Sequence, residues 1–159
     1  MLALCGTEHI VVAFTGLEGV GKTTLASAVA KDTHEFFSDG VLWGDFKGSS
    51  NGIGAVVRSF LVALDRDTTQ IMSNEDLIKL LRLALASKRM LLILDNVTGT
   101  DFEPSSLLSH SSPSKILLTT ANRDLAAVVA NTTVDLQPLN EEAARVLLLR
   151  IAGEELPAL

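Results

Sequence analysis

Short runs of consecutive apolar residues recur along the chain and predict buried β-strands. The clearest runs cover residues 10–14, 90–94 and 116–118, and weaker strand signals cover residues 41–43 and 132–136. Strands that are covered on both faces of a sheet read as continuous apolar runs, whereas half-exposed strands alternate apolar and polar positions. The runs therefore favour a sheet that lies between two layers of helices.

Between these runs, apolar residues are spaced as on one face of a helix. Such stretches cover residues 25–30, 55–64, 77–85 and 143–148. Two of them follow residues that suit a helix N-terminus, Ser73 before one and Asn140 before the other. Strands that alternate with helices imply right-handed crossovers and a parallel sheet, whose ligands bind at the carboxyl ends of the strands.

A glycine-rich motif links the first predicted strand to the first predicted helix. Residues 16–23 read Gly-Leu-Glu-Gly-Val-Gly-Lys-Thr and match G-x-x-x-x-G-K-[ST] at every fixed position. Glycines let the backbone curve around a phosphate with its N–H groups turned inward, and the following helix adds the positive end of its dipole. The motif therefore predicts a site for the phosphates of a nucleotide.

Each side chain of the motif has an expected role. Lys22 is expected to reach the β and γ phosphates, Thr23 to coordinate Mg²⁺ through its hydroxyl, and Thr24 to contact the α phosphate. Glu18 is expected to point to solvent, because its carboxylate would repel a phosphate, while its backbone N–H serves the site. The candidate nucleotide-binding residues are Gly16, Leu17, Glu18, Gly19, Val20, Gly21, Lys22, Thr23 and Thr24.

A carboxylate at the end of a later apolar run completes the expected site. Residues 91–95 read Leu-Leu-Ile-Leu-Asp, which places Asp95 at the carboxyl end of a buried strand. With the phosphate-binding motif upstream, Asp95 is expected to orient the Mg²⁺ through water. Thr23 and Asp95 are thus the candidate metal ligands.

Composition and charge exclude several other classes of protein. The chain has 159 residues, of which 47% are apolar and 20% charged, so it fits one globular domain. The net charge is −6 and basic residues form no run, which argues against direct nucleic-acid binding. No apolar run approaches the roughly 18 residues of a membrane span, and Cys5 has no partner for an internal disulfide. We therefore expect a cytoplasmic protein without a membrane partner.

Five segments in order resemble the NB-ARC branch of the STAND ATPases. This family comprises nucleotide switches of plant immune receptors (NOD-like proteins of innate immunity), apoptotic adaptors, and bacterial or fungal regulators. The segments are an extended phosphate loop at 16–26, a second strand with a tryptophan at 37–43, a Walker B strand at 91–97, a sensor strand at 115–120, and the L-x-P-L-x-x-x-x-A entry to a helix at 136–143.

The resemblance implies a fold and a function. The fold is an α/β P-loop NTPase, a three-layer α/β/α sandwich with a mainly parallel five-stranded sheet in the order 5-1-4-3-2. The function is an ATP/ADP-binding switch in signal transduction, in which slow Mg²⁺-dependent hydrolysis of ATP drives conformational change and assembly. The implied partners are the nucleotide, other domains of a longer protein, and like subunits in a nucleotide-dependent oligomer.

The resemblance also implies that residues 1–159 form a single nucleotide-binding domain cut from a longer protein. The helical and winged-helix subdomains of the family would follow Leu159, and most adenine contacts would lie outside this chain. ATP is preferred over GTP on the resemblance, supported by the absence of an Asn-Lys-x-Asp guanine motif.

Two positions depart from the family pattern. Where many members have a second acid after the Walker B Asp, this chain has Asn96, which cannot accept a proton at neutral pH, so efficient hydrolysis is not expected. The sensor strand commonly ends Thr-Thr-Arg, but here Ala121 follows and the arginine comes as Arg123. Arg123 either reaches a γ phosphate or only begins the next helix. Lys22, Asp95, Asn96 and Arg123 are the candidate catalytic residues.

Other interpretations stay open. The domain could be a nucleotide-locked scaffold that never turns over, or a small-molecule kinase, although no lid rich in basic residues is evident. Asp45, after the second strand, is interpreted as a solvated strand end, with a position facing the site as the alternative. Trp43 is interpreted as a core residue rather than a platform on which a base stacks.

Overall fold

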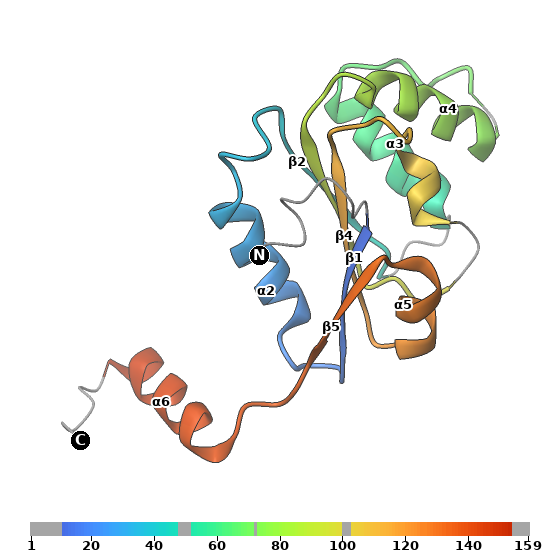
Figure 1. Ribbon diagram of the computed structural model, residues 1–159. Helices are drawn as coiled ribbons and strands as arrows, with labels where there is room; N and C mark the ends of the chain where they lie inside the picture. Colours follow the sequence, from blue (N-terminus) through green and yellow to red (C-terminus); the bar gives the residue numbers. More distant parts are fainter. Residues whose placement is uncertain (1–10, 48–51, 72, 100–102, 154–159) are drawn as a thin grey trace.

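Five parallel strands form one sheet in the computed structural model, which describes residues 11–47, 52–71, 73–99 and 103–153 (Figure 1). The strands are β1 (Val11–Gly16), β2 (Gly40–Asp45), β3 (Met90–Asp95), β4 (Lys115–Thr120) and β5 (Thr132–Leu136). Their order across the sheet is β2-β3-β4-β1-β5, and every neighbouring pair is parallel. This is the predicted order read from the other edge, so the prediction is confirmed, including the sensor strand β4 between β1 and β3.

Helices cover both faces of the sheet (Figure 1). The helices are α2 (Lys22–Asp32), α3 (Gly52–Ala63), α4 (Asn74–Leu85), the 3-10 helix η1 (Pro104–Leu107), α5 (Arg123–Val129) and α6 (Glu141–Ala152). One core cluster joins a face of the sheet to α3, α4, η1 and α5, and a second joins the opposite face to α2. The predicted three-layer sandwich is confirmed.

The burial of each strand follows its place in the sheet. All residues of β1, β3 and β4 are buried, as their continuous apolar runs predicted. The edge strand β2 alternates exposed and buried positions instead, and β5 is mostly exposed. Trp43 lies on β2 with 39% of its surface exposed, so its interpretation as a core residue is wrong. The reason is that an edge strand has one face without a complete helical cover.

Predicted helix starts are confirmed by their hydrogen bonds. The Ser73 hydroxyl accepts from the backbone N–H of Asp76 and donates to its carboxylate, and Asn140 accepts from the N–H of Ala143. Helix α6 has no buried residue and extends away from the sheet (Figure 1). Across the described ranges, none of the helices combines the length and hydropathy that crossing a membrane requires.

Candidate functional site

The phosphate loop depends on glycines with left-handed backbone. Gly16, Gly19 and Gly21 have φ of 139°, 78° and 101°, a region that costs other residues free energy. Gly16 also lies so close to β5 that an added Cβ would be 2.5 Å from the carbonyl oxygen of Leu136. Gly21 begins α2 without a side-chain cap. The first N–H groups of α2 are therefore left for another acceptor.

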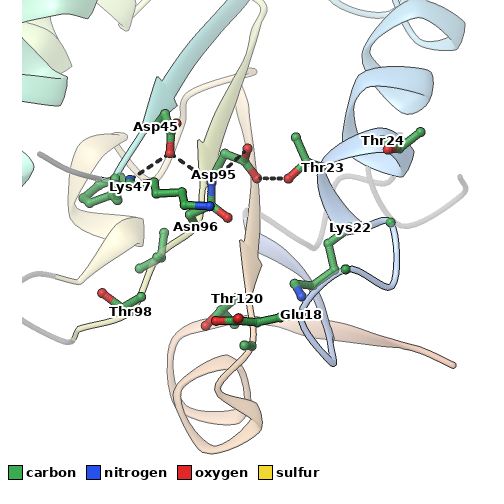
Figure 2. A pocket seen from close by; sticks show the side chains of 15 residues that line it. Glu18, Lys22, Thr23, Thr24, Asp45, Lys47, Asp95, Asn96, Thr98 and Thr120 are labelled. Atoms are coloured by element: carbon green, nitrogen blue, oxygen red, sulfur yellow. Dashed lines mark hydrogen bonds between the residues drawn. The ribbon is translucent and has the colours of Figure 1, made fainter. Parts of the chain in front are cut away.

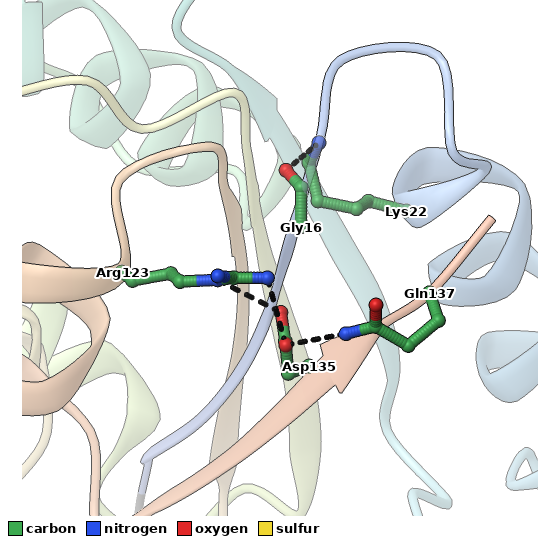
Figure 3. A network of polar contacts seen from close by, with 5 residues as sticks. All are labelled: Gly16, Lys22, Arg123, Asp135 and Gln137. Atoms are coloured by element: carbon green, nitrogen blue, oxygen red, sulfur yellow. Dashed lines mark hydrogen bonds and ion pairs between the residues drawn. The ribbon is translucent and has the colours of Figure 1, made fainter.

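Lys22 is folded back onto the loop that precedes it. Its ammonium donates to the carbonyl oxygen of Gly16 at 2.9 Å (Figure 3) and to that of Leu17 at 2.8 Å, and its side chain is buried. An ammonium has three N–H donors, so one is left for an anion in the cavity that Lys22 lines. The contacts with the loop fix where that positive charge lies.

Thr23 and Asp95 lie side by side although 72 positions separate them in the chain. The Thr23 hydroxyl donates to Oδ1 of Asp95 at 2.9 Å. Thr119, on the strand between β1 and β3, donates its hydroxyl to the same oxygen and accepts from the backbone N–H of Asn96 at 3.0 Å. Asp95 is almost fully buried, and these hydrogen bonds stabilise its carboxylate there.

Asn96 connects the two strand ends on one side of the cavity. Its amide nitrogen donates to Oδ1 of Asp45 at 3.0 Å and lies 3.3 Å from Oδ2 of Asp95. Its backbone has a φ of 60°, which asparagine tolerates better than most residues. This conformation ends β3, and the next N–H, that of Val97, donates to the carbonyl of Thr119.

Asp45 lies at the same level of the sheet as Asp95, because β2 and β3 pair with these residues in register. Its Oδ1 also accepts from the backbone N–H of Lys47 at 2.8 Å. The Asn96 hydrogen bond is the main cause that lowers the pKa of Asp45, followed by the Lys47 N–H and then by the positive charge of Lys47. Asp45 is exposed, as its interpretation as a solvated strand end predicts. It also lines the cavity, as the alternative of a position facing the site predicts.

One cavity of about 780 Å³ brings these groups together (Figure 2). That volume falls in the range of small-molecule sites. Its lining includes six of the nine predicted nucleotide-binding residues, namely Glu18, Gly19, Gly21, Lys22, Thr23 and Thr24, and also the predicted catalytic residues Asp95 and Asn96. The Glu18 side chain is exposed at this cavity. The cavity thus combines backbone N–H groups, two lysines (Lys22 and Lys47), hydroxyls and three carboxylates (Glu18, Asp45 and Asp95).

Arg123 lies outside the lining of this cavity. It begins α5 and pairs through two nitrogens with both carboxylate oxygens of Asp135 on β5, at 3.1 and 2.9 Å, and Gln137 donates to the same carboxylate (Figure 3). The interpretation that Arg123 begins a helix is confirmed. Its contact with a γ phosphate stays a prediction.

The site contains residues that the sequence did not predict, among them Thr119 and Lys47. The sequence places Thr119 only within the sensor strand, yet its hydroxyl contacts Asp95, and Lys47 lines the cavity beside Asp45. The position of Thr119 could have been predicted from the expected strand order, because that order places the carboxyl end of β4 between the phosphate loop and Asp95. No pattern in the sequence pointed to Lys47.

The arrangement of Thr23 and Asp95 fits a magnesium ion. A hydroxyl and a carboxylate oxygen 2.9 Å apart at the phosphate loop are hard oxygen ligands of the kind that Mg²⁺ takes, together with water and substrate phosphates. Within the described ranges, no group of three His, Cys, Asp or Glu side chains could hold a metal ion.

Comparisons of sequence agree with the geometry. The model of the NB-ARC domain family matches residues 2–156. The regulatory protein AfsR of Streptomyces griseus is 32% identical over 155 residues, covering 94% of this chain and 16% of AfsR. The disease resistance-like protein CSA1 of Arabidopsis thaliana is 29% identical over 149 residues, covering 89% of this chain and 12% of CSA1. The chain thus spans less than a fifth of these curated relatives.

A comparison of structures supports the fold. The Cdc6p protein of Pyrobaculum aerophilum superposes with a TM-score of 0.59 at 14% identity, covering 90% of this chain and 43% of Cdc6p. At this identity the likeness concerns the arrangement of strands and helices alone.

Proposed function

Because the chain belongs to the NB-ARC domain family, we propose that it is an ATP/ADP-binding switch domain of a signalling protein with slow Mg²⁺-dependent ATP hydrolysis. The observation that carries the proposal is the meeting of the phosphate loop with the Thr23–Asp95 pair in one cavity. The relatives AfsR and CSA1, by name a regulatory and a disease resistance-like protein, support a role in signalling.

Phosphate binding is assigned to the loop and to the start of α2. The backbone N–H groups around Gly19 and Gly21 donate hydrogen bonds to the phosphate oxygens, because the helix end and the left-handed glycines leave these N–H groups without side-chain caps. Lys22 donates its third N–H to the phosphates while the carbonyls of Gly16 and Leu17 hold it in place. Thr24, at the cavity wall, adds a hydroxyl.

Thr23 and Asp95 are assigned to the magnesium ion. The Thr23 hydroxyl would hold the ion directly through its oxygen, and the Asp95 carboxylate would hold it through water. The ion, when bound, neutralises charge on the phosphates and thereby favours transfer of the γ-phosphoryl group. Thr119 keeps Asp95 oriented, since it donates to the same oxygen as Thr23.

The switch itself is assigned to differences in contact between the ADP-bound and ATP-bound forms. A nucleotide shifts a conformational equilibrium only through its differential affinity for the two states. The γ phosphate is the group that differs, and the strand ends with Asn96 and Thr120 face the cavity that receives it. Other domains of a longer protein and like subunits are the proposed partners, in the cytoplasm and without direct contact to nucleic acid.

A nucleotide-locked scaffold is the second candidate function, and Asn96 favours it. The side chain at this position cannot act as a base, and its amide is already engaged with Asp45. In this alternative the domain binds ATP and keeps it.

One quench experiment tests both candidates. The purified chain is mixed with Mg²⁺ and a substoichiometric amount of radiolabelled ATP, quenched at intervals, and the bound nucleotide is separated. We expect bound ADP and released phosphate to accumulate slowly, and no retained nucleotide in Lys22→Ala. Bound ATP that persists for hours would support the scaffold, and binding that survives in Lys22→Ala would contradict the proposed site.

A further inference from the structure

We propose that Asp45, held by Asn96, is the carboxylate that orients the attacking water during ATP hydrolysis. The inference rests on the proposed function and names a further residue of the same site. The carboxylate comes from β2 because β3 offers no second one: Asp95 is followed by an asparagine.

The sheet register brings Asp45 to the site. In the parallel pairing of β2 and β3, Asp45 is the strand partner of Asp95, so both carboxylates lie at the carboxyl edge where ligands of such sheets bind. Both also line the cavity that contains Lys22 and Thr23 (Figure 2). Asp45 therefore faces the same ligand as the predicted magnesium ligands, from the side opposite α2.

The hydrogen bonds of Asp45 fix its position and leave it able to accept more. Within the described residues, the side chain accepts from Asn96 Nδ2 at 3.0 Å and from the Lys47 N–H at 2.8 Å, both at Oδ1. Oδ2 therefore retains its lone pairs for a water molecule. A carboxylate with one oxygen fixed by two donors is a preorganised acceptor, which is what orienting a water requires.

Asn96 acts as a positioning residue in this arrangement. The hydrogen bond from its amide nitrogen holds the carboxylate of the neighbouring strand beside Asp95, whose Oδ2 lies 3.3 Å from the same nitrogen. Its left-handed backbone sets the direction of the side chain, and the hydrogen bond from its N–H to Thr119 holds that backbone. Asp45 on β2, positioned by Asn96, therefore supplies the carboxylate that a second acid after Asp95 would otherwise supply.

The chemical step is balanced with water as the only co-reactant. The water oxygen forms a bond to the γ-phosphorus while the bond from that phosphorus to the β–γ bridging oxygen breaks. The bridging oxygen keeps the electron pair and leaves with ADP. A proton of the water passes along its hydrogen bond to Asp45 and then to solvent, and phosphate is released.

The test compares Asp45→Asn with Asp67→Asn. Asp67 is a matched control, because it also accepts from the backbone N–H two residues later, that of Thr69, but it is outside the cavity lining. We expect Asp45→Asn to bind ATP within about threefold of the original chain and to hydrolyse it at least about 100-fold more slowly in a single turnover, the range for loss of an acid–base group. Asp67→Asn is expected to match the original chain in both.

A binding measurement adds a readout that does not depend on turnover. ADP with aluminium fluoride mimics the transferring phosphoryl group with its in-line water, so Asp45→Asn should lose about tenfold or more in affinity for this complex while its affinity for ADP is unchanged. Asn96→Ala should show a smaller loss in the same direction. Thermal unfolding checks that each variant is folded.

The outcomes separate the two proposals. Absence of ATP binding by the original chain would overturn the proposed function. Binding with hydrolysis that is equally fast in Asp45→Asn would overturn only the role of Asp45. Binding without any hydrolysis by the original chain would also overturn that role and leave a nucleotide-binding scaffold.

Discussion

The hydroxyl of Thr23 donates a hydrogen bond of 2.9 Å to Oδ1 of Asp95, across the boundary between the phosphate loop and the third strand. These are the two side chains that are expected to share a magnesium ion. Their contact shows that the fold places this hydroxyl and this carboxylate next to each other. Little rearrangement is then needed at this point of the site, which keeps the cost of binding low.

Replacing Thr23 by valine should remove the magnesium dependence of ATP binding. Valine has nearly the shape of threonine but no oxygen to coordinate the ion, so affinity for ATP with Mg²⁺ is expected to fall about tenfold or more, while affinity without Mg²⁺ changes little. Titration calorimetry with and without Mg²⁺ measures both. The control is Ser27→Ala, one turn along α2, whose ATP affinity should still depend on Mg²⁺. If the ATP affinity of Thr23→Val also depends on Mg²⁺ as in the original chain, Thr23 is not a ligand of the ion.

Alanine at Gly16 and alanine at Gly19 should differ in their effect on stability. Both glycines have positive φ, but only at Gly16 would the new Cβ meet backbone, the carbonyl oxygen of Leu136 at 2.5 Å. We expect Gly19→Ala to lower the free energy of unfolding by about 1 kcal/mol and Gly16→Ala by roughly 3 kcal/mol or more. Urea unfolding measures both, and equal losses would mean that the close approach to β5 does not constrain the loop.

An aspartate at position 96 should not accelerate hydrolysis. The side chain of Asn96 lies 3.0 Å from Oδ1 of Asp45 and 3.3 Å from Oδ2 of Asp95, so a third carboxylate there would repel both and would remove the donor that holds Asp45. Asn96→Asp is expected to unfold more easily, by about 1–2 kcal/mol, and to hydrolyse ATP no faster than the original chain.

The control for this variant is Asn74→Asp in the first turn of α4, where a carboxylate suits the helix dipole and stability should not fall. A higher rate of single-turnover hydrolysis in Asn96→Asp would contradict the account, since it would show that a second acid on β3 is what the site lacks.

Methionine at Lys115 should stabilise the protein at neutral pH. Burial lowers the pKa of Lys115 below its ordinary value of 10.5. Between the lowered folded pKa and 10.5 the unfolded chain binds more protons than the folded one, so stability rises with pH in that window. Below the folded pKa the ammonium is charged in both the folded and the unfolded state. The free-energy cost of burying the charge then lowers stability in full.

Lys115→Met removes that cost and with it the alkaline rise in stability. Urea unfolding at several pH values from 7 to 10 checks this, with Lys79→Met as an exposed control. A Lys115→Met curve that runs parallel to that of the original chain would show that the burial of this lysine does not affect folding.

The central strands were predictable because burial on both faces leaves a direct trace in the sequence. Residues 90–94 and 116–118 lie within β3 and β4, which end one or two residues later with the polar groups of the site. The prediction for Trp43 is wrong because composition alone does not tell an edge strand from a central one. The predictions for Cys5 and for residue 10, where the first apolar run starts, concern residues outside the described ranges.

The phosphate loop and Asp95 were predictable from motifs, but the hydrogen bonds that join them were not. Thr119 contacts Asp95 from 24 positions away, and Asn96 contacts Asp45 from 51 positions away, through the order and register of three strands. A sequence motif records residue types at fixed spacing and carries no information on such register. The hydrogen bond by which Asn96 holds Asp45 could therefore be found only in the structure.

The central claim is that the loop at Lys22 binds a nucleotide, and titration calorimetry of ATP with Mg²⁺ tests it most directly. The chain should bind one ATP. Lys22→Ala should bind at least about tenfold more weakly, since it loses a charge-assisted hydrogen bond. Lys31→Ala, at the other end of α2, should bind as the original chain does. No binding by the original chain, or equal binding by the Lys22 variant, would contradict the account.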